Sequence, residues 1–201
     1  MIKALVTGFA PFAGDAINPS YEAVRRLPAR IGELQIVTAE LPTSFARAPR
    51  VLRQWIAREQ PGIVLCVGLA ADRPAISLER VAVNLSDARI ADNDGAQPHN
   101  KPVIARGPAA YFSTLPVVQA QTALTRAGIA AELSLSAGAF VCNHVFYGLM
   151  HAASKQRRIK HAGFVHVPAL PANDDQHALG QLTRALAIVL RVSSHNRRSK
   201  R

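Results

Sequence analysis

Cys142 stands where a stretch of small residues, 134–139, gives way to an amphipathic run that extends to Ala153. This pattern predicts a turn that leads into a helix, with Cys142 in the first helical turn. Unpaired backbone N–H groups and the positive end of the helix dipole favour a thiolate at such a position. The same N–H groups can hold the oxyanion of a tetrahedral intermediate. The local sequence is therefore typical of a cysteine nucleophile, although a lone cysteine is more often a small buried hydrophobe.

His166 is the candidate general base for this thiol. It lies near the end of a predicted strand, 162–167, and Pro168 follows directly. Loops at the carboxyl ends of strands form the active crevice of open α/β sheets, so a histidine at a strand end can reach it. A core histidine bonded to the backbone is the alternative. A cysteine elsewhere in the chain at a helix start favours a Cys–His pair.

A Cys–His pair usually has a third group that orients the imidazole. Glu79 stands out among the acids because the segment around it, 76–84, is otherwise strand-like, although its apolar alternation slips near Arg80. An exposed strand carboxylate paired with Arg80 would explain it equally well. Spacing alone does not choose between Glu79 and Asp87. The acids available in the adjoining segments are Glu79, Asp87, Asp92 and Asp94.

The order of the elements predicts the architecture that must position these groups. Strands alternate with helices along one chain, which argues for an α/β fold: a three-layer α/β/α sandwich with a central, largely parallel mixed sheet. Ser113-Thr114 is expected to cap one helix, with Gly128 after its end. Strands are expected at 1–8, 34–41, 63–67, 76–83, before Ser134 and at 162–167, and helices after Asn18-Pro19, around 51–56, at about 116–127, after Cys142 and from about Asp175.

Composition limits the class of protein. The 201 residues suit one catalytic domain, 1–190, followed by a basic tail, 191–201, that we expect to be disordered. The net charge of +11 owes much to this tail, and the body has no arginine-packed helix, so nucleic acid is not an expected partner. Two cysteines are too few for a disulfide framework, which favours the cytoplasm.

Other signals are absent from the sequence. No apolar run approaches the roughly 18 residues that span a membrane. The histidines lack zinc-ligand spacing, and there is neither a GxGxxG nor a Walker motif, so no metal and no cofactor are expected.

Taken together, several motifs resemble a known family, the pyroglutamyl peptidases of the pyrrolidone-carboxylate peptidase type. They occur in the family's order and cover nearly the whole chain. They are TGFAPF (7–12) with NPS (18–20), LP (41–42), LERVAVN (78–84), DARIADN (87–93), AGAFVCN (137–143) and HVPALP (166–171).

The resemblance implies a cysteine-type omega-peptidase that hydrolyses the amide bond after an N-terminal pyroglutamyl residue of peptides. Cys142 would be the nucleophile, His166 the base and acid, and Glu79 the orienting carboxylate. The family is metal-free and cytoplasmic, and its members are homo-oligomers, so a tetramer or dimer is expected. The resemblance also assigns substrate-binding residues: Arg89 near the oxyanion, Phe9 and Phe12 around the lactam ring, and Asn18, Leu69 and Val141 in the same pocket.

One stretch departs from the family. The loop after the central strand reads Gly-Gln-Ala-Gly-Gly-Arg in the family and Gly-Leu-Ala-Ala-Asp-Arg here, at 68–73. Leu69 thus replaces a glutamine associated with substrate recognition, which predicts a weakened or shifted preference. Ala71 and Asp72 replace glycines, which would restrict the loop if it needed positive φ. The alternatives are a related cysteine amidase for a different cyclic amide or acyl substrate, or an inactive domain that binds nucleic acid through its charge.

Overall fold

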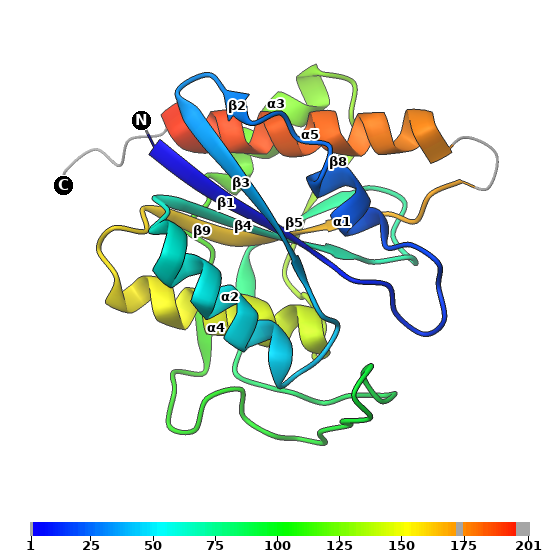
Figure 1. Cartoon of the computed structure of the whole chain (residues 1–201), viewed down its shortest axis with the longest axis vertical. Helices are drawn as coiled ribbons and strands as arrows, with labels where there is room; N and C mark the ends of the chain where they lie inside the picture. The colour runs from blue at the N-terminus through cyan, green and yellow to red at the C-terminus, as the bar shows by residue number, and fades with distance from the viewer. Residues whose placement is uncertain (1, 172–174, 196–201) are drawn as a thin grey trace.

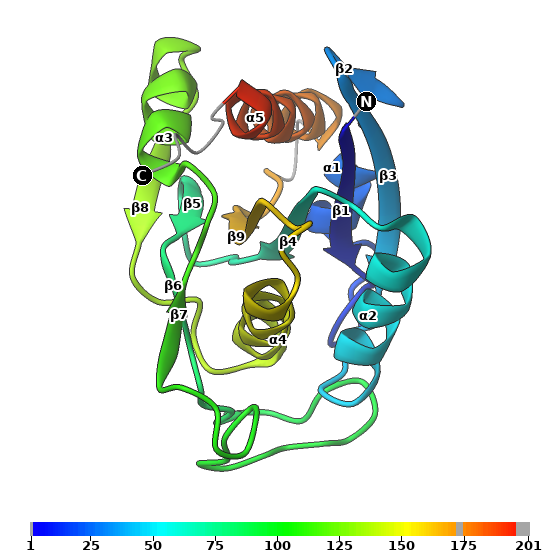
Figure 2. The ribbon, with the colours of Figure 1, turned by 90° about the vertical axis from the view of Figure 1, so that its left-hand side faces the viewer.

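The computed structural model describes residues 2–171 and 175–195. A seven-stranded sheet crosses the molecule, with helices on both faces (Figures 1 and 2). Its strands are β1 (Ile2–Phe9), β2 (Arg30–Ile31), β3 (Leu34–Leu41), β4 (Ile63–Leu69), β5 (Ile76–Glu79), β8 (Ala131–Ser134) and β9 (His161–Val167). The helices are α1 (Pro19–Val24), α2 (Arg47–Glu59), α3 (Val117–Arg126), α4 (Val141–Lys155) and α5 (Asp175–His195).

The strand order is β2-β3-β1-β4-β9-β5-β8. Four strands, β3, β1, β4 and β9, run parallel to one another. β5 pairs antiparallel with β9, and β8 pairs parallel with β5. β4 and β9 are buried along nearly their whole length, and their apolar residues explain why they lie at the centre of the sheet. The predicted three-layer sandwich with a largely parallel mixed sheet is confirmed.

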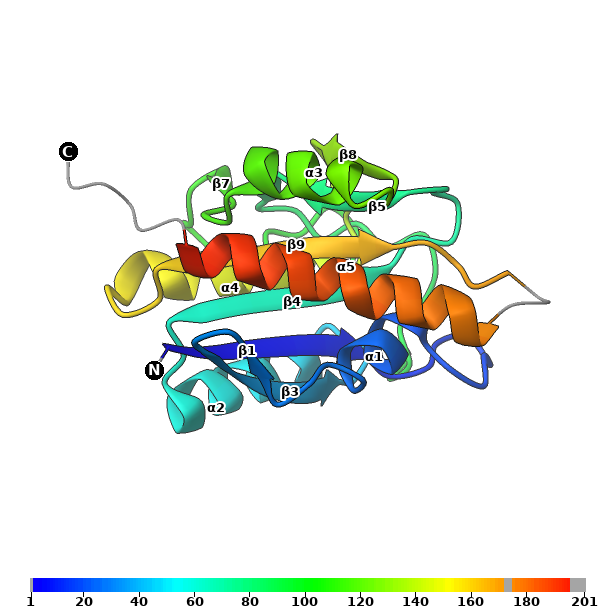
Figure 3. The same ribbon diagram turned by 90° about the horizontal axis from the view of Figure 1, so that it is seen from above.

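Alternate side chains of each strand enter two separate cores. One core lies between the sheet and α1, α3 and α5, and it takes Leu65, Val67 and Val165 from the central strands. The other lies between the sheet and α2 and α4, and it takes Cys66 and Phe164. Figures 2 and 3 show α5 and α3 on one side of the sheet and α4 on the other. Cys66 is fully buried in mid-strand, as expected of a structural cysteine.

The extended segment 76–83 divides at Arg80. Before Arg80 the chain forms β5 of the main sheet, and after it the chain forms β6 (Val81–Val83), which pairs with β7 (Ala110–Phe112) in a separate two-stranded sheet. Arg80 joins the two sheets through its backbone: its N–H donates to Ser134 O and its carbonyl accepts from Ser113 N–H. This transfer explains why the apolar alternation of the sequence slips there.

Two expectations about helix ends need correction. Ser113 and Thr114 do not cap α3, whose N-cap position is Pro116 without a side-chain bond. The Thr114 hydroxyl instead accepts from Ala162 N–H and so ties the segment to β9. The second concerns the basic tail: its first part, 191–195, belongs to α5, and residues 196–201 lie outside the described residues.

No helix in the described part of the chain combines the length and apolarity that membrane crossing requires. Within the same residues, no group of three or more His, Cys, Asp or Glu side chains could hold a metal ion.

Candidate active site

The first turn of α4 places Cys142 against the end of the central strand β4. Because β1, β4 and β9 are parallel, their carboxyl ends meet at one edge of the sheet, and α4 begins there. The approach is very close: a β-carbon built on Gly68 would lie 2.9 Å from Cys142 Sγ. Gly68 pairs directly with His166 of β9, so the thiol lies beside the strand pair that carries the imidazole.

His166 and Glu79 form a buried pair across the two antiparallel strands β9 and β5. The His166 Nδ1 atom lies 2.8 Å from Glu79 Oε1, and the two side chains are 5% and 0% exposed. The strand register explains the contact, since Glu79 stands opposite Phe164 and His166 follows Phe164 on the same face. An ionised Glu79 accepts from Nδ1–H, which leaves Nε2 of a neutral imidazole as the proton acceptor.

The other three candidate acids have different partners. Asp92 accepts from the backbone N–H groups of Phe45, Asp94 and Ala96 and so organises its own loop. Asp94 is paired with Arg47. Asp87 is exposed, and its carboxylate accepts from Asn100 N–H. Glu79 is thus the only one of the four acids whose carboxylate contacts His166 in the part of the chain that the structure describes.

Burial works against ionisation of Cys142. Loss of solvent is the largest effect that raises the pKa of its thiol, to about 12, and the negative charge of Glu79 adds to it. Arg73 and the backbone N–H of Cys142 itself lower the pKa, but they are weaker. These effects oppose the preference for a thiolate that the helix start predicts, and they favour a protonated thiol at rest. A base must remove its proton when the sulfur attacks.

Aromatic rings gather beside the helix start. Phe140, the N-cap residue of α4, packs against Phe12 with ring centroids 5.4 Å apart and against Phe45 at 5.2 Å. Phe12 is half-buried. Phe9 is only 3% exposed and packs in the core against Phe164, which in turn lies 4.8 Å from the His166 ring. The two predicted lactam-contacting rings are therefore unequal in exposure.

Three polar side chains hold the loop that carries Phe12. Asn18 Nδ2 and the Thr43 hydroxyl both donate to the carbonyl of Ala10, and Asn93 Nδ2 donates to Pro11 O. Asn18 also caps α1, since its Oδ1 accepts from Ser20 N–H. Asn18 is 7% exposed, so it acts here by shaping the loop.

The remaining predicted residues are distributed unevenly around the thiol. Leu69 ends β4 next to Gly68 and is half-buried. Val141 is fully buried in the core, so only its backbone could line a ligand site. Arg89 is exposed, and within the described residues its guanidinium makes no hydrogen bond or ion pair, so no contact joins it to Cys142. Ala71 and Asp72 do not have positive φ, so the expected strain in their loop is absent.

Sequence reasoning missed three contributors. Gly68 is needed for the close approach of the thiol, Phe140 completes the aromatic group, and Arg73 binds Glu79. Gly68 and Arg73 lie in the loop 68–73 that departs from the family, and Phe140 lies in the AGAFVCN motif. Only Arg73 carried a chemical signal, as a cation that precedes the strand of Glu79.

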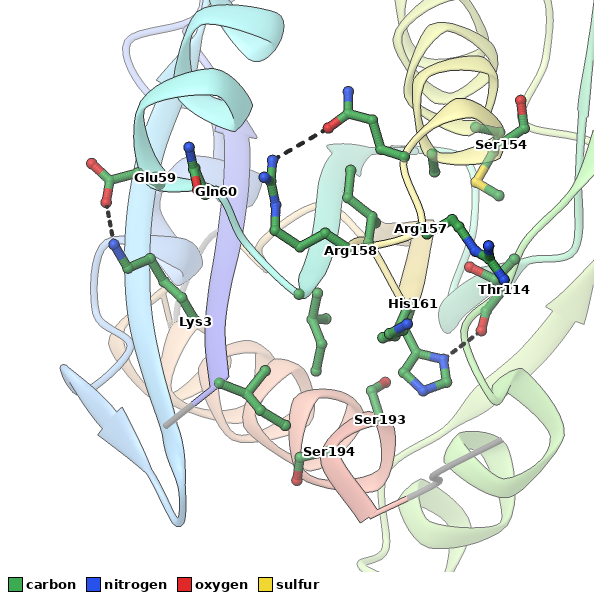
Figure 4. A pocket seen from close by; sticks show the side chains of 18 of the residues that line it. Lys3, Glu59, Gln60, Thr114, Ser154, Arg157, Arg158, His161, Ser193 and Ser194 are labelled. Atoms are coloured by element: carbon green, nitrogen blue, oxygen red, sulfur yellow. Dashed lines mark hydrogen bonds and ion pairs between the residues drawn. The ribbon is translucent and has the colours of Figure 1, made fainter. Parts of the chain in front are cut away.

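A cavity of about 1040 Å³ lies at the opposite edge of the sheet (Figure 4). The beginnings of β1, β4 and β9 and the end of α4 line it. The Lys3–Glu59 ion pair at 3.0 Å and the bond of His161 Nδ1 to Thr114 O at 2.7 Å lie on its walls. Neither Cys142, His166 nor Glu79 is among its described lining residues, so it is distinct from the candidate active site.

Comparison with known proteins agrees with the geometry. The family model of the pyroglutamyl peptidases (Peptidase_C15) matches residues 2–191. A pyrrolidone-carboxylate peptidase of Bacillus cereus is 45% identical over 190 residues, which cover 94% of this chain and 88% of that protein.

Solved structures give the same result. The crystal structure of pyroglutamyl peptidase I from Bacillus amyloliquefaciens matches with a TM-score of 0.92 and 42% identity, over 98% of both chains. The pyrrolidone carboxyl peptidase of Thermococcus litoralis matches with a TM-score of 0.92 and 35% identity, over 97% of this chain and 94% of that one. This chain belongs to the pyroglutamyl peptidase family of cysteine peptidases.

Proposed function

We propose that this protein removes N-terminal pyroglutamate from peptides, with Cys142 as nucleophile, His166 as general base and acid, and Glu79 as the carboxylate that orients the imidazole. The observation that carries the assignment is the 2.8 Å bond between His166 and Glu79, beside the glycine on which the Cys142 thiol rests. Family membership supplies the substrate class, since relatives are named pyrrolidone-carboxylate peptidases.

The chemistry begins from a protonated thiol. His166 accepts the Sγ proton through Nε2 as sulfur bonds to the pyroglutamyl carbonyl carbon. The imidazolium then gives this proton to the departing amine, the C–N bond breaks, and a thioester remains on Cys142. Water, deprotonated by His166, attacks the thioester, and the thiol leaves with the proton. The products are free pyroglutamate and the shortened peptide.

Glu79 contributes through position and charge. Its bond to Nδ1 fixes the tautomer that presents Nε2 to the thiol, and its negative charge stabilises the imidazolium that forms in each step. The oxyanion would be held by the free N–H groups at the start of α4, among them that of Cys142, and by Arg89 as the family resemblance implies.

The surroundings suit a neutral cyclic amide. Phe12 and Phe140 provide an apolar wall beside the nucleophile, and Phe9 supports the sheet beneath. Pyroglutamate has no ammonium group because its amine is tied up in the lactam. A peptide with a free amino terminus would bring an unpaired charge against these rings, which is costly.

Leu69 favours a second candidate, a related cysteine amidase with a different cyclic amide or acyl substrate. It adjoins Gly68 and is half-buried at the end of β4, where its side chain cannot hydrogen-bond a lactam group. Loss of such a bond predicts weaker binding of pyroglutamate without a change in the chemical steps.

We further propose that the protein is cytoplasmic and forms a homo-oligomer, a tetramer or a dimer. Free Cys66 and Cys142 suit a reducing compartment, and a reactive cysteine needs one. Sedimentation equilibrium of the purified protein tests the oligomeric state, and a monomer at all concentrations would contradict this part.

The decisive experiment is hydrolysis of a pyroglutamyl-coumarin amide by the protein and by Cys142→Ala. Turnover that disappears in the variant supports the assignment. Absence of turnover, with alkylation of Cys142 by iodoacetamide that becomes faster as the pH rises, favours the second candidate. Absence of both turnover and alkylation contradicts an enzymatic function and leaves the nucleic-acid-binding alternative, which salt-dependent binding would reveal.

A further inference from the structure

The guanidinium of Arg73 joins three segments of the active site. Its Nη1 lies 2.7 Å from Glu79 Oε1 and 3.3 Å from the Ser134 hydroxyl, and its Nη2 donates to Ser136 O at 2.8 Å. Arg73 itself belongs to the loop that follows β4 and Leu69. The contacts therefore link this loop, the end of β5, and the turn that leads from β8 to Cys142.

Glu79 needs a cationic partner. Its side chain is fully buried, and its second oxygen, Oε2, makes no hydrogen bond to any described residue. A buried carboxylate is costly unless a charge or several hydrogen bonds compensate it, and a neutral imidazole supplies no charge. Arg73 is the one cation in contact with Glu79 within the described residues, and its own side chain is 24% exposed.

Both partners of Glu79 share one oxygen. His166 Nδ1 and Arg73 Nη1 approach Oε1 at 2.8 and 2.7 Å, so the position of this oxygen depends on both bonds. We infer that Arg73 is a positioning residue of the active site, which holds the Glu79 carboxylate in place for His166 and ties the turn before Cys142 to it. This inference rests on the proposed roles of Cys142, His166 and Glu79.

Electrostatics at the nucleophile agree with this role. The charge of Glu79 raises the pKa of the Cys142 thiol, and the charge of Arg73 lowers it. The other titratable groups that face this region are Cys66 on β4, which raises the pKa, and His166 on β9. Arg73 thus compensates the buried charge of Glu79, which binds the His166 imidazole. It also offsets part of the increase that this charge causes in the pKa of the Cys142 thiol.

The test compares Arg73→Met with Arg73→Lys. Methionine keeps the length of the side chain without its charge, whereas lysine keeps the charge and one donor. We expect Arg73→Met to lower kcat roughly ten- to a hundredfold with little change in KM, because the lost interaction orients the catalytic groups. At a given pH, alkylation of Cys142 by iodoacetamide should slow about tenfold, which corresponds to about one unit in thiol pKa. Arg73→Lys should recover most of both rates.

Arg80→Met is the matched control, because Arg80 is exposed and its side chain has no ion pair with a described residue. It should behave as the unchanged protein. If Arg73→Met also keeps kcat and the alkylation rate, the inference is wrong. If Arg73→Lys is as slow as Arg73→Met, the role is one of packing and the inference is equally wrong.

Two further measurements distinguish a folding defect of Arg73→Met, or a failure of the proposed function, from a failure of this inference. If Arg73→Met does not fold, the double variant with Glu79→Gln removes the uncompensated buried charge and should restore the melting temperature. A double variant that also fails to fold overturns the pairing. Alkylation does not depend on the substrate, so the effect of Arg73 can be measured even if the protein does not hydrolyse pyroglutamyl amides and the proposed function fails.

Discussion

Gly68 and Cys142 are in such close contact that the strand has no room for a β-carbon: it would lie 2.9 Å from Cys142 Sγ and as close to the Phe164 ring. Real β-carbons do not approach heavy atoms within 3.0 Å, so either the thiol or the ring must move if one is introduced. The glycine therefore sets the distance between the start of α4 and the sheet, and with it the position of the Cys142 thiol relative to His166.

Gly68→Ala tests this relationship. We expect kcat to fall at least tenfold, because a displacement of the thiol by about 1 Å disturbs the attack geometry. The melting temperature should fall as well, since overpacking of a core costs about 1–3 kcal/mol. The matched control is Gly148→Ala on α4, the helix that carries Cys142, because nothing lies within 4 Å of the added carbon there. Equal activities of the two variants would contradict the role of Gly68.

Glu79→Gln should keep the fold and lose the orientation of His166. A neutral amide can hold the imidazole in the wrong tautomer, so kcat should fall roughly a hundred- to ten-thousandfold with KM nearly unchanged. Asp87→Asn is the matched control because its carboxylate is exposed and does not contact His166. Steady-state kinetics of both variants decide the matter, and a large effect of Asp87→Asn alone would point to the wrong acid.

The pH dependence of Cys142 alkylation tests whether the thiol of Cys142 is protonated at rest. A pKa raised to about 12 means that the thiolate fraction is small at neutral pH and grows about tenfold for each pH unit. The alkylation rate should therefore rise steadily from about pH 7 to about pH 10 without a plateau. A plateau near neutral pH would show a preformed thiolate–imidazolium pair. Cys142→Ala provides the blank, since Cys66 is fully buried.

Leu69→Gln tests the departure from the family loop. If the missing hydrogen bond matters, the glutamine variant should bind pyroglutamyl amides more tightly, with KM lower by roughly ten- to a hundredfold. Its kcat should change little, because the side chain is not part of the proposed triad. An unchanged KM would remove the idea that Leu69 shifts the substrate preference.

Asn18→Ala should loosen the loop that carries Phe12. It removes the cap of α1 and the bond to Ala10 O, at a cost of about 1 kcal/mol for the cap. KM should rise more than kcat falls. Thermal melting and kinetics of the same preparation separate the loss of stability from the loss of substrate binding, and a change in kcat alone would argue against the loop's role.

The element types, the fold class and the family could be predicted from the sequence. Alternating strand and helix patterns predicted the sandwich, because their apolar periods of two and 3.6 residues are local properties. The slip near Arg80 was visible for the same reason, although its meaning, a change of sheet, was not. Cys142 at a helix start and His166 at a strand end were also local signals, and six ordered motifs identified the family.

How these groups meet depends on contacts between segments that are distant in the sequence. The choice of Glu79 over Asp87 depends on the register of β5 against β9, which brings Glu79 to His166, 87 positions away in the chain. The ionisation of Cys142 could not be derived from the sequence, because the helix terminus is a local signal, whereas burial and the charges of Glu79 and Arg73 come from distant segments. Gly68 and Arg73 were passed over for the same physical reason: a close approach of a strand to a helix, or an ion pair between a loop and a strand, exists only once the chain has folded.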